Sequence, residues 1–440
     1  MAPSRKTGTT KAYNHAIQTR VLIFNNFLIL ILPFREDFLI LGMPKPTYPY
    51  YNKLFKNLQL PLAYCDIDLL NENCRDIALR CDGHKTIRVA SKSVRCVAVL
   101  QHILHSNPVY KGLMCYTGRE ALFLSEQGFD DLLLGYPIVN REEIRDVCLA
   151  TKNGKKIILM VDSIAHLQLT NEMAKEVGVI QPLCIDIDMS TDFPGLHFGV
   201  LRSPLTTVDA AQKLIDAFDN YSNISLSGIM GYEAQVAGLG EKNPANGIKN
   251  YVIPFLKKKS ITDYTKRRQK IVAYAKEKGH RLMLVNAGGT GSIESSKTED
   301  WVTEITVGSG FYSPALFDYY SNFRHRPAAG FAVQIVRQPK EGHYTCLGGG
   351  YIASGTIGTD KQPKPYLPEG VTLTENEGTG EVQTPFEYKG GEPIGLGDTI
   401  LFRHSKAGEL CERFNHLHLI SNGRITAVVP TYRGQGQCFL

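Results

Sequence analysis

The feature of this sequence that most constrains its fold is a repeated alternation of short apolar runs and longer amphipathic segments. Eight apolar runs occur within about 225 residues, and each but the last is clearly followed by a segment whose apolar residues recur every three or four positions. Continuous apolar runs of this kind are typical of parallel strands that are buried on both faces. The runs span residues 86–92, 112–117, 131–137, 156–162, 182–188, 224–232, 282–290 and 304–310. Eight strand-and-helix units predict an α/β fold of the (β/α)8 TIM barrel type.

A doubly wound sheet is the alternative arrangement for the same pattern. In dinucleotide-binding sheets of that kind, a G-x-G-x-x-G turn follows the first strand. Here the first run ends in Ser91-Lys92-Ser93, and no such glycine pattern follows it. The barrel is therefore the preferred prediction.

The character of the sequence changes after about Pro327. The remaining residues hold short β-type runs separated by turns rich in glycine and proline, and they contain no convincing helix. We therefore expect a second, all-β domain, with which the earlier run LAYCDID (62–68) is available to pair. The predicted organisation is an uncertain N-terminal extension (1–42), a lead-in strand and helix (43–85), the barrel (86–326) and a C-terminal β-domain (327–440).

The charge and the cysteine content of the sequence indicate which binding partners and which cellular compartment to expect. The formal net charge is +6, of which residues 1–42 carry +3 (five Lys/Arg, two Asp/Glu), so the rest of the chain is near neutral for its size. We find no basic stripe interleaved with aromatic residues, so nucleic acid is not expected as a partner. The ten cysteines are scattered singly without a CxxC pair, which is typical of reduced thiols in a cytoplasmic protein.

The N-terminal residues contain an apolar run, VLIFNNFLILILPF (21–34), that follows a basic segment without acidic residues. This order is typical of a signal-peptide or signal-anchor core. However, the run is interrupted by two asparagines, and it is shorter than the about 20 residues that a membrane-spanning helix needs. We expect a cytoplasmic protein, with membrane association only if this run is a genuine targeting segment.

The active site of a TIM barrel lies at the carboxyl ends of its strands, so residues there are the functional candidates. The first run ends in Lys92, which stands between Ser91 and Ser93. A surface lysine needs no such small neighbours, whereas a lysine that binds a cofactor covalently needs room beside it. An amine must also be neutral to react, and nearby positive charge lowers the pKa of an amine. Arg88, on the same strand face, and Arg95 are candidates for that charge.

A glycine-rich turn, AGGTGS, follows the seventh run and offers three glycines and two hydroxyl side chains. Glycines let backbone N–H groups approach a phosphate closely, and barrel phosphate sites lie after strands seven and eight. A second turn, GSG (308–310), follows the eighth run and completes the predicted site. Two flexible loops are the alternative interpretation. The residues of the first turn are Gly288, Gly289, Thr290, Gly291 and Ser292.

A lysine that ends strand one and a phosphate site after strands seven and eight suit pyridoxal 5'-phosphate, which carries an aldehyde and a phosphate. On these residues the sequence resembles the fold-type III pyridoxal-phosphate enzymes, in the branch of D-threonine aldolase and D-serine dehydratase rather than alanine racemase proper. The resemblance covers about residue 55 to the C-terminus, and its motifs are specific mainly through their order and spacing. The matching segments are IRVASKSVR (87–95), GIMGYEAQ (228–235), VNAGGTGS (285–292) and EITVGSGFY (304–312).

The resemblance implies a role for each matching residue. Lys92 is implied as the lysine that forms the Schiff base, the glycine-rich turn as the phosphate site, and Tyr232 as a neighbour of the cofactor ring. Together with Arg88, the predicted cofactor-binding residues are Lys92, Tyr232, Gly288, Gly289, Thr290, Gly291, Gly308 and Tyr312.

The chain departs from the family in its β-domain. The branch typically holds a divalent metal with an H-x-C or H-x-D pair, but here the corresponding residues are His404 and Lys406. A protonated lysine is not a metal ligand, although the positive charge of its ammonium group can take the place of the metal ion. Two interpretations stay open, a metal at His404 with an unidentified second ligand and a metal-free site.

The resemblance implies a lyase that acts on D-β-hydroxy amino acids, by aldol cleavage or by dehydration with release of ammonia, and it implies a homodimer. Three other functions stay open: an amino-acid racemase on the same fold, a non-catalytic pyridoxal-phosphate carrier, and a phosphosugar-binding barrel. A racemase needs a second base, for which Tyr232 and a tyrosine of the β-domain are candidates, and a carrier usually consists of the barrel alone. The predicted catalytic residues are Lys92, Tyr232, His404 and Lys406.

Overall fold

The computed structural model describes residues 20–24, 27–31 and 46–440, except 84, 245–246 and 357. The chain divides into two compact units, Met1–Lys45 and Pro46–Leu440. In the first unit, β1 (Arg20–Phe24) and β2 (Phe27–Ile31) pair antiparallel. The rest of the apolar run 21–34 lies outside the described residues. No helix in the described part of the chain is long and apolar enough to cross a membrane.

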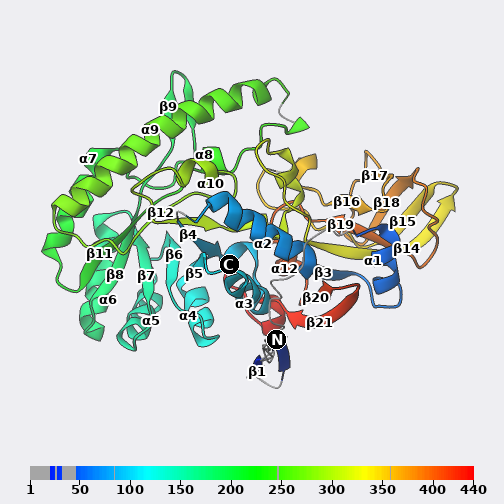
Figure 1. Cartoon of the computed structure of the whole chain (residues 1–440), viewed down its shortest axis with the longest axis horizontal. Helices are drawn as coiled ribbons and strands as arrows, with labels where there is room; N and C mark the ends of the chain where they lie inside the picture. Colours follow the sequence, from blue (N-terminus) through cyan, green and yellow to red (C-terminus); the bar gives the residue numbers. More distant parts are fainter. Residues whose placement is uncertain (1–19, 25–26, 32–45, 84, 245–246, 357) are drawn as a thin grey trace, which may run out of the picture. The chain divides into compact units, whose positions relative to one another are not determined.

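The second unit contains the predicted barrel (Figure 1). In the described part of the chain, eight parallel strands close into a ring in the order β4-β5-β6-β7-β8-β11-β12-β13. Each strand overlaps one of the eight apolar runs, so the TIM barrel prediction is confirmed. The strands are β4 (Thr86–Ala90), β5 (Tyr110–Cys115), β6 (Leu132–Pro137), β7 (Ile157–Val161), β8 (Gln181–Asp186), β11 (Ile224–Gly231), β12 (Leu284–Ala287) and β13 (Glu304–Val307).

Amphipathic helices cover the outside of the barrel. Several begin at a side chain that accepts a hydrogen bond from the first helical turn, such as Thr117, Asn140 and Ser163. After β12 and β13 the chain forms only single helical turns, α10 (Ile293–Ser296) and α11 (Ser309–Tyr312). The longer helices of the barrel are α3 (Val97–Ser106), α4 (Gly118–Glu126), α5 (Arg141–Lys152), α6 (Ile164–Val177), α7 (Val208–Ala217) and α9 (Lys249–Glu277).

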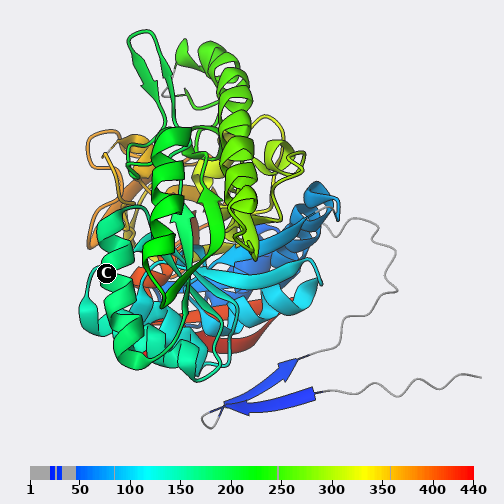
Figure 2. The same ribbon diagram turned by 90° about the vertical axis from the view of Figure 1, so that its left-hand side faces the viewer.

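Two insertions extend past the barrel strands. The hairpin of β9 (Thr191–Phe193) and β10 (Leu196–Phe198) follows β8, and the short α8 (Ala234–Ala237) and the long α9 follow β11. Figure 2 shows the hairpin and one end of α9 projecting together beyond the barrel.

The C-terminal residues form the predicted β-domain. Its main sheet has the order β17-β18-β15-β14-β3-β20-β21, and β19 and β16 join it beside β14. β3 (Leu62–Asp66) pairs with β14 and β20, so the prediction that residues 62–68 pair with this domain is confirmed. α1 (Tyr48–Phe55) precedes β3, and α2 (Ile67–Cys81) leads from β3 to the barrel.

The other strands of this domain are β14 (Ala329–Lys340), β15 (His343–Leu347), β16 (Lys364–Leu367), β17 (Val371–Leu373), β18 (Gln383–Tyr388), β19 (Thr399–Arg403), β20 (His416–Ser421) and β21 (Arg424–Pro430). The only α-helix there among the described residues is α12 (Leu410–Arg413), a single turn. All ten cysteines are free, as predicted from their spacing.

Candidate active site

Lys92 lies in a single 3-10 turn, Ser91–Ser93, directly after β4. The two flanking serines are buried, and Ser91 Oγ donates to Met114 O at 2.8 Å, whereas Lys92 itself is exposed. Arg95 Nε donates to Lys92 O at 2.9 Å. The two serines therefore anchor the turn in the barrel wall, and the lysine side chain between them is exposed at the carboxyl end of the strand.

Tyr136 is the direct partner of this amine. It lies near the carboxyl end of β6, and Lys92 Nζ donates to Tyr136 Oη at 2.5 Å. Tyr136 was not among the residues predicted from the sequence. Its place at the end of the third apolar run could have identified it as a residue of the carboxyl face of the barrel. Tyr232, just after β11, lies close enough for the two phenols to interact electrostatically. Burial, then the charges of Glu233 and Tyr136, raise the pKa of Tyr232 to about 12.

The glycine-rich turn lies after β12, where the sequence predicts a phosphate site. Gly288 has a φ of +81°, a left-handed conformation that disfavours any side chain. At Gly291 a side-chain carbon would lie 2.5 Å from Ala237 O. Thr290 Oγ1 accepts the Gly310 N–H at 3.0 Å, so this hydrogen bond joins the turns after β12 and β13. The loop therefore has one tightly determined shape.

The opposite side of the same loop is anchored by Arg80 of α2. Arg80 Nη2 donates to Thr290 O at 2.7 Å, and Arg80 Nε pairs with Glu294 at 2.7 Å. The lead-in helix thus holds the glycine-rich loop from outside the barrel, a contact that no local sequence pattern indicates.

Gly308 brings the last turn next to the lysine. A side-chain carbon at Gly308 would lie 2.5 Å from Ser93 Oγ, so only glycine allows this approach. Tyr312 is different: it is fully buried, and its hydroxyl donates to Val94 O at 3.2 Å. Burial raises the pKa of Tyr312 well above its ordinary value. This hydrogen bond supports the lysine segment from behind, and it does not direct Tyr312 toward a ligand.

Arg88 differs from its predicted role. Its guanidinium pairs with Glu304 at 2.7 Å and with Asp131 at 3.0 Å, two residues at the amino-terminal side of the barrel. The side chain is 1% exposed, and its donors are engaged by these groups and by backbone carbonyls. Arg88 therefore stabilises the barrel interior, and its geometry supports neither contact with a cofactor nor an uncompensated positive charge beside Lys92.

Asp186 ends β8 at the carboxyl face of the barrel. Burial, and then the nearby charges of Asp162 and Asp188, raise the pKa of Asp186 to about 8. Its neighbour Asp188 accepts the Ser190 N–H at 2.8 Å. A carboxyl group with this pKa exchanges protons near neutral pH.

The surroundings of His404 do not suit a metal. His404 is 3% exposed, and burial lowers its pKa to about 3. Lys406 Nζ donates to Ser354 O at 2.9 Å, and Ser405 Oγ donates to the backbone carbonyls of Asp360 and Gln362. Among the described residues no three His, Cys, Asp or Glu side chains are placed to hold a metal ion. Both ring nitrogens of His404 are buried without a hydrogen-bond partner, so this side chain is available as a ligand, but the described residues do not complete a three-ligand site around it.

Comparisons with known proteins agree with this geometry. The sequence matches the alanine racemase N-terminal domain family over residues 65–315. No curated protein matches the sequence. Similar solved structures include D-threonine aldolase from Filomicrobium marinum, with a TM-score of 0.72 and 16% identity over 86% of this chain and 96% of that chain.

Two further structures have the same fold. D-threo-3-hydroxyaspartate dehydratase from Delftia sp. HT23 has a TM-score of 0.68 and 16% identity over 86% of this chain and 98% of that chain. Alanine racemase from Clostridium difficile 630, in complex with cycloserine, has a TM-score of 0.59 and 16% identity over 85% of this chain and 99% of that chain. At these identities the likenesses show the fold and leave the reaction open.

Proposed function

Since the chain belongs to the alanine racemase N-terminal domain family, and to the fold-type III pyridoxal-phosphate enzymes, we propose that it is a pyridoxal-phosphate-dependent lyase acting on D-β-hydroxy amino acids. The observation that carries the proposal is the placement of Lys92. It ends the first barrel strand, and Gly308 joins its turn to the loops that would bind the phosphate. Aldol cleavage and dehydration are the two candidate reactions, because an aldolase and a dehydratase are both among the similar structures.

The residues present suit pyridoxal phosphate. When bound, this cofactor supplies an electron sink for negative charge at the substrate Cα. Lys92 would hold the cofactor covalently: its amine donates to the Tyr136 hydroxyl and forms no salt bridge with a carboxylate in the part of the chain that the structure describes. Backbone N–H groups of the Gly288–Gly291 turn would receive the phosphate. A neutral Lys92 amine would serve as the base on its face of the site.

A racemase is the second candidate, because an alanine racemase is among the similar structures. Racemisation needs a proton acceptor on each face of the substrate. A useful base has a pKa near the working pH, and burial raises the pKa of Tyr232 to about 12. Tyr232 is therefore a poor base at neutral pH, so a racemase would need another residue as its second base.

A metal has no part in the proposal, because the groups around His404 do not fit one. The polarisation of a substrate β-hydroxyl is then left to protein groups. Lys406 lies two residues after His404, and its ammonium group donates to Ser354 O at 2.9 Å. We propose His404 and Lys406 as residues that border the substrate, on the strength of their match to the family's metal-binding pair.

The resemblance to fold-type III enzymes also supports a homodimer, a small amino-acid substrate and a cytoplasmic location as proposals.

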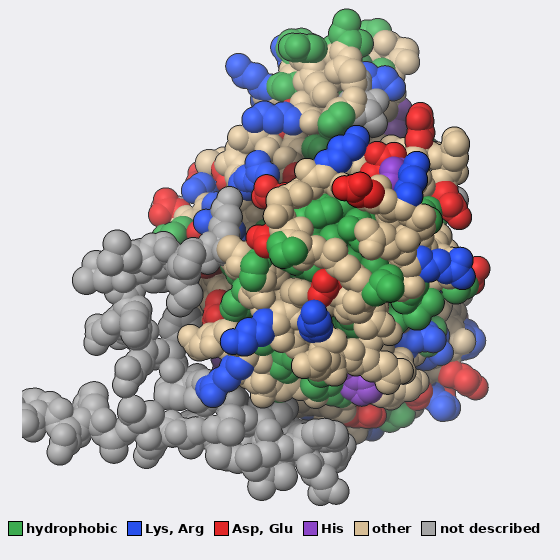
Figure 3. Space-filling model, turned by 90° about the vertical axis from the view of Figure 1, so that its right-hand side faces the viewer, with side chains coloured by type: hydrophobic (Ala, Val, Ile, Leu, Met, Phe, Trp, Pro, Cys, Tyr) green, Lys and Arg blue, Asp and Glu red, His purple; other side chains and the backbone are tan. Residues whose placement is uncertain are grey.

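Figure 3 shows acidic and basic side chains interspersed over one face of the molecule, and that face has no broad basic area. This pattern supports the proposal that nucleic acid is not a partner. Light scattering on the purified protein tests the dimer.

The test of the proposal compares the absorption spectra of wild-type protein, Lys92→Ala and the surface variant Lys111→Ala after incubation with pyridoxal phosphate. We expect a yellow band in the wild type and in Lys111→Ala, and no band in Lys92→Ala. D-threonine, D-serine and their L-forms are then screened for aldehyde, ammonia and enantiomer. A colourless wild type would refute the cofactor assignment, and interconversion of enantiomers without either product would establish the racemase.

A further inference from the structure

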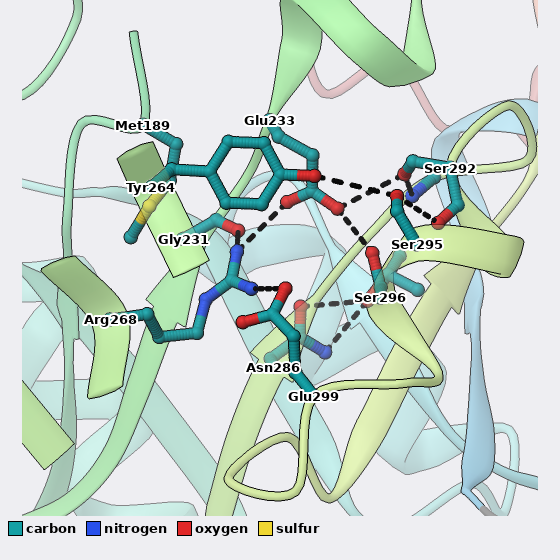
Figure 4. A network of polar contacts seen from close by, with 12 residues as sticks. Met189, Gly231, Glu233, Tyr264, Arg268, Asn286, Ser292, Ser295, Ser296 and Glu299 are labelled. Carbon is teal, nitrogen blue, oxygen red and sulfur yellow. Dashed lines mark hydrogen bonds and ion pairs between the residues drawn. The ribbon is translucent and has the colours of Figure 1, made fainter. Parts of the chain in front are cut away.

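Three ionisable side chains are buried together between the loops that follow β11 and β12 (Figure 4). Glu233, Arg268 and Glu299 are 0%, 0% and 4% exposed. Glu233 Oε2 accepts from Arg268 Nη2 at 3.0 Å, and Arg268 Nη1 donates to Glu299 Oε1. Arg268 comes from α9, so this buried triad joins the long helix to two loops of the barrel mouth.

The stability of the fold does not explain the triad. Charged groups lose their hydration when they are buried, and apolar side chains of similar size are often as stabilising or more so. Arg268 Nε and Glu299 Oε2 also have no hydrogen-bond partner in the described structure. Buried polar atoms without a partner are rare. The burial of these three charged side chains therefore needs an explanation other than stability, and the contacts of the triad with the glycine-rich loop supply one.

The triad reaches this loop through two serines. Glu233 Oε1 accepts from Ser292 Oγ at 3.1 Å and also from Ser296 Oγ. Because the Ser292 hydroxyl donates its proton to Glu233, its oxygen is left to accept the Gly289 N–H at 3.0 Å. The Glu233 carboxylate is thus one hydroxyl group away from a backbone amide of the loop.

The same triad fixes the backbone around Tyr232. Arg268 Nη2 also donates to Gly231 O at 2.8 Å, so one guanidinium holds the residues on both sides of Tyr232. The Tyr232 ring in turn lies against the loop, because a side-chain carbon at Gly289 would lie 3.1 Å from Tyr232 Cε2.

We propose that Glu233 is a positioning residue for the cofactor. Through Ser292 it sets the shape of the loop that binds the phosphate, and through Arg268 it holds the backbone that carries Tyr232. This inference rests on the proposed function, because it takes the loop after β12 as the phosphate site.

Glu233→Gln tests the inference, because an amide of nearly the same size has one acceptor oxygen and cannot serve both Ser292 and Arg268. We expect pyridoxal phosphate to bind roughly 10- to 100-fold more weakly. Pyridoxal, which has no phosphate, should lose much less affinity. Both affinities are measured by titrating the cofactor-free full-length protein and following the absorption band that depends on Lys92.

Three further variants separate positioning from folding. Ser292→Ala removes only the link to Gly289 and should show the same selective loss, even if Glu233→Gln does not fold. Ser296→Ala keeps that link and should bind pyridoxal phosphate nearly as the wild type does. Glu304→Gln breaks a buried pair with Arg88 on the amino-terminal side of the barrel, so it should lower the melting temperature without a selective loss.

The affinities of these variants for the two compounds decide whether Glu233 positions the cofactor. Normal pyridoxal-phosphate affinity in both Glu233→Gln and Ser292→Ala overturns the inference and leaves the proposed function intact. Equal losses of pyridoxal and pyridoxal phosphate in those variants also overturn it, since they indicate a general structural defect. A wild-type protein that binds neither compound overturns the proposed function, and the inference falls with it.

Discussion

Replacement of Glu120 by glutamine should change how the stability of this protein depends on pH. Glu120 begins the buried face of α4 and is 0% exposed. Its Oε2 accepts the Tyr116 N–H at 2.7 Å, and its Oε1 contacts the Tyr432 hydroxyl at 3.0 Å. Burial is the largest cause of a rise in the pKa of Glu120 from 4.5 to about 7. The carboxyl group is therefore largely protonated in the folded protein in mildly acidic solution.

The sign and size of the effect follow from this pKa. A carboxyl group whose pKa is higher in the folded state contributes stability that is fully present below its unfolded pKa and is lost as the pH rises through its folded pKa. A rise from 4.5 to about 7 makes this loss about 2 to 3 kcal/mol between pH 5 and pH 8. The amide of Glu120→Gln resembles the protonated acid and does not titrate. Relative to the wild type, Glu120→Gln should therefore gain about 2 to 3 kcal/mol between these two pH values.

Urea unfolding of the two proteins at several pH values from 5 to 8 measures the difference, with exposed Glu277→Gln as the control. The free energy of unfolding of Glu120→Gln should fall less steeply with pH than that of the wild type, and the control should follow the wild type. Parallel curves for the wild type and Glu120→Gln would refute the reasoning, because they would mean that Glu120 ionises alike in the folded and unfolded states.

Other predictions concern the site itself. Tyr136→Phe removes the hydroxyl group bonded to Lys92, so the cofactor band should persist but titrate at a different pH; an identical spectral titration would contradict a functional contact. Gly289→Ala would put a carbon 2.8 Å from the nearest side-chain atom and should weaken pyridoxal-phosphate binding, whereas Gly391→Ala has open space and should not; equal affinities would argue against this loop. Elemental analysis should find no stoichiometric divalent metal, and chelator treatment should leave activity unchanged; a bound metal lost in His404→Ala would show that the site forms after all.

The sequence predicted those features that local patterns determine. The apolar runs located all eight barrel strands, and the turn sequences located Lys92 and the glycine-rich loop at the same face. Period-two alternation placed Arg88 on the same strand face as Lys92, but it could not show that the side chain reaches Asp131 and Glu304 at the amino-terminal side of the barrel. A long side chain is directed by its charged partners, and these lie far away in the sequence.

The parts that escaped prediction are contacts between distant segments. Glu233 belongs to the motif GIMGYEAQ, in which only Tyr232 was predicted to have a role. No residue near Glu233 in the sequence indicated that Arg268 is its partner. Tyr312 shows the same limit, since Gly310 of its motif bonds to Thr290 in the glycine-rich loop while the Tyr312 hydroxyl bonds to Val94 O. Motifs identify which residues gather at a site, but side-chain direction follows from packing.

The β-domain takes a direct part in holding the reactive lysine. Tyr432 N–H donates to Arg95 O at 2.9 Å, and the Arg95 guanidinium pairs with Glu412 while its Nε bonds to Lys92 O. Gly408 has no room for a side chain, because the Lys92 carbonyl lies against it. The turn that presents Lys92 is thus fixed from the barrel on one side and from the β-domain on the other. A pyridoxal-phosphate carrier needs only the barrel, so this double anchoring favours an enzyme that must hold its amine in one position through a reaction.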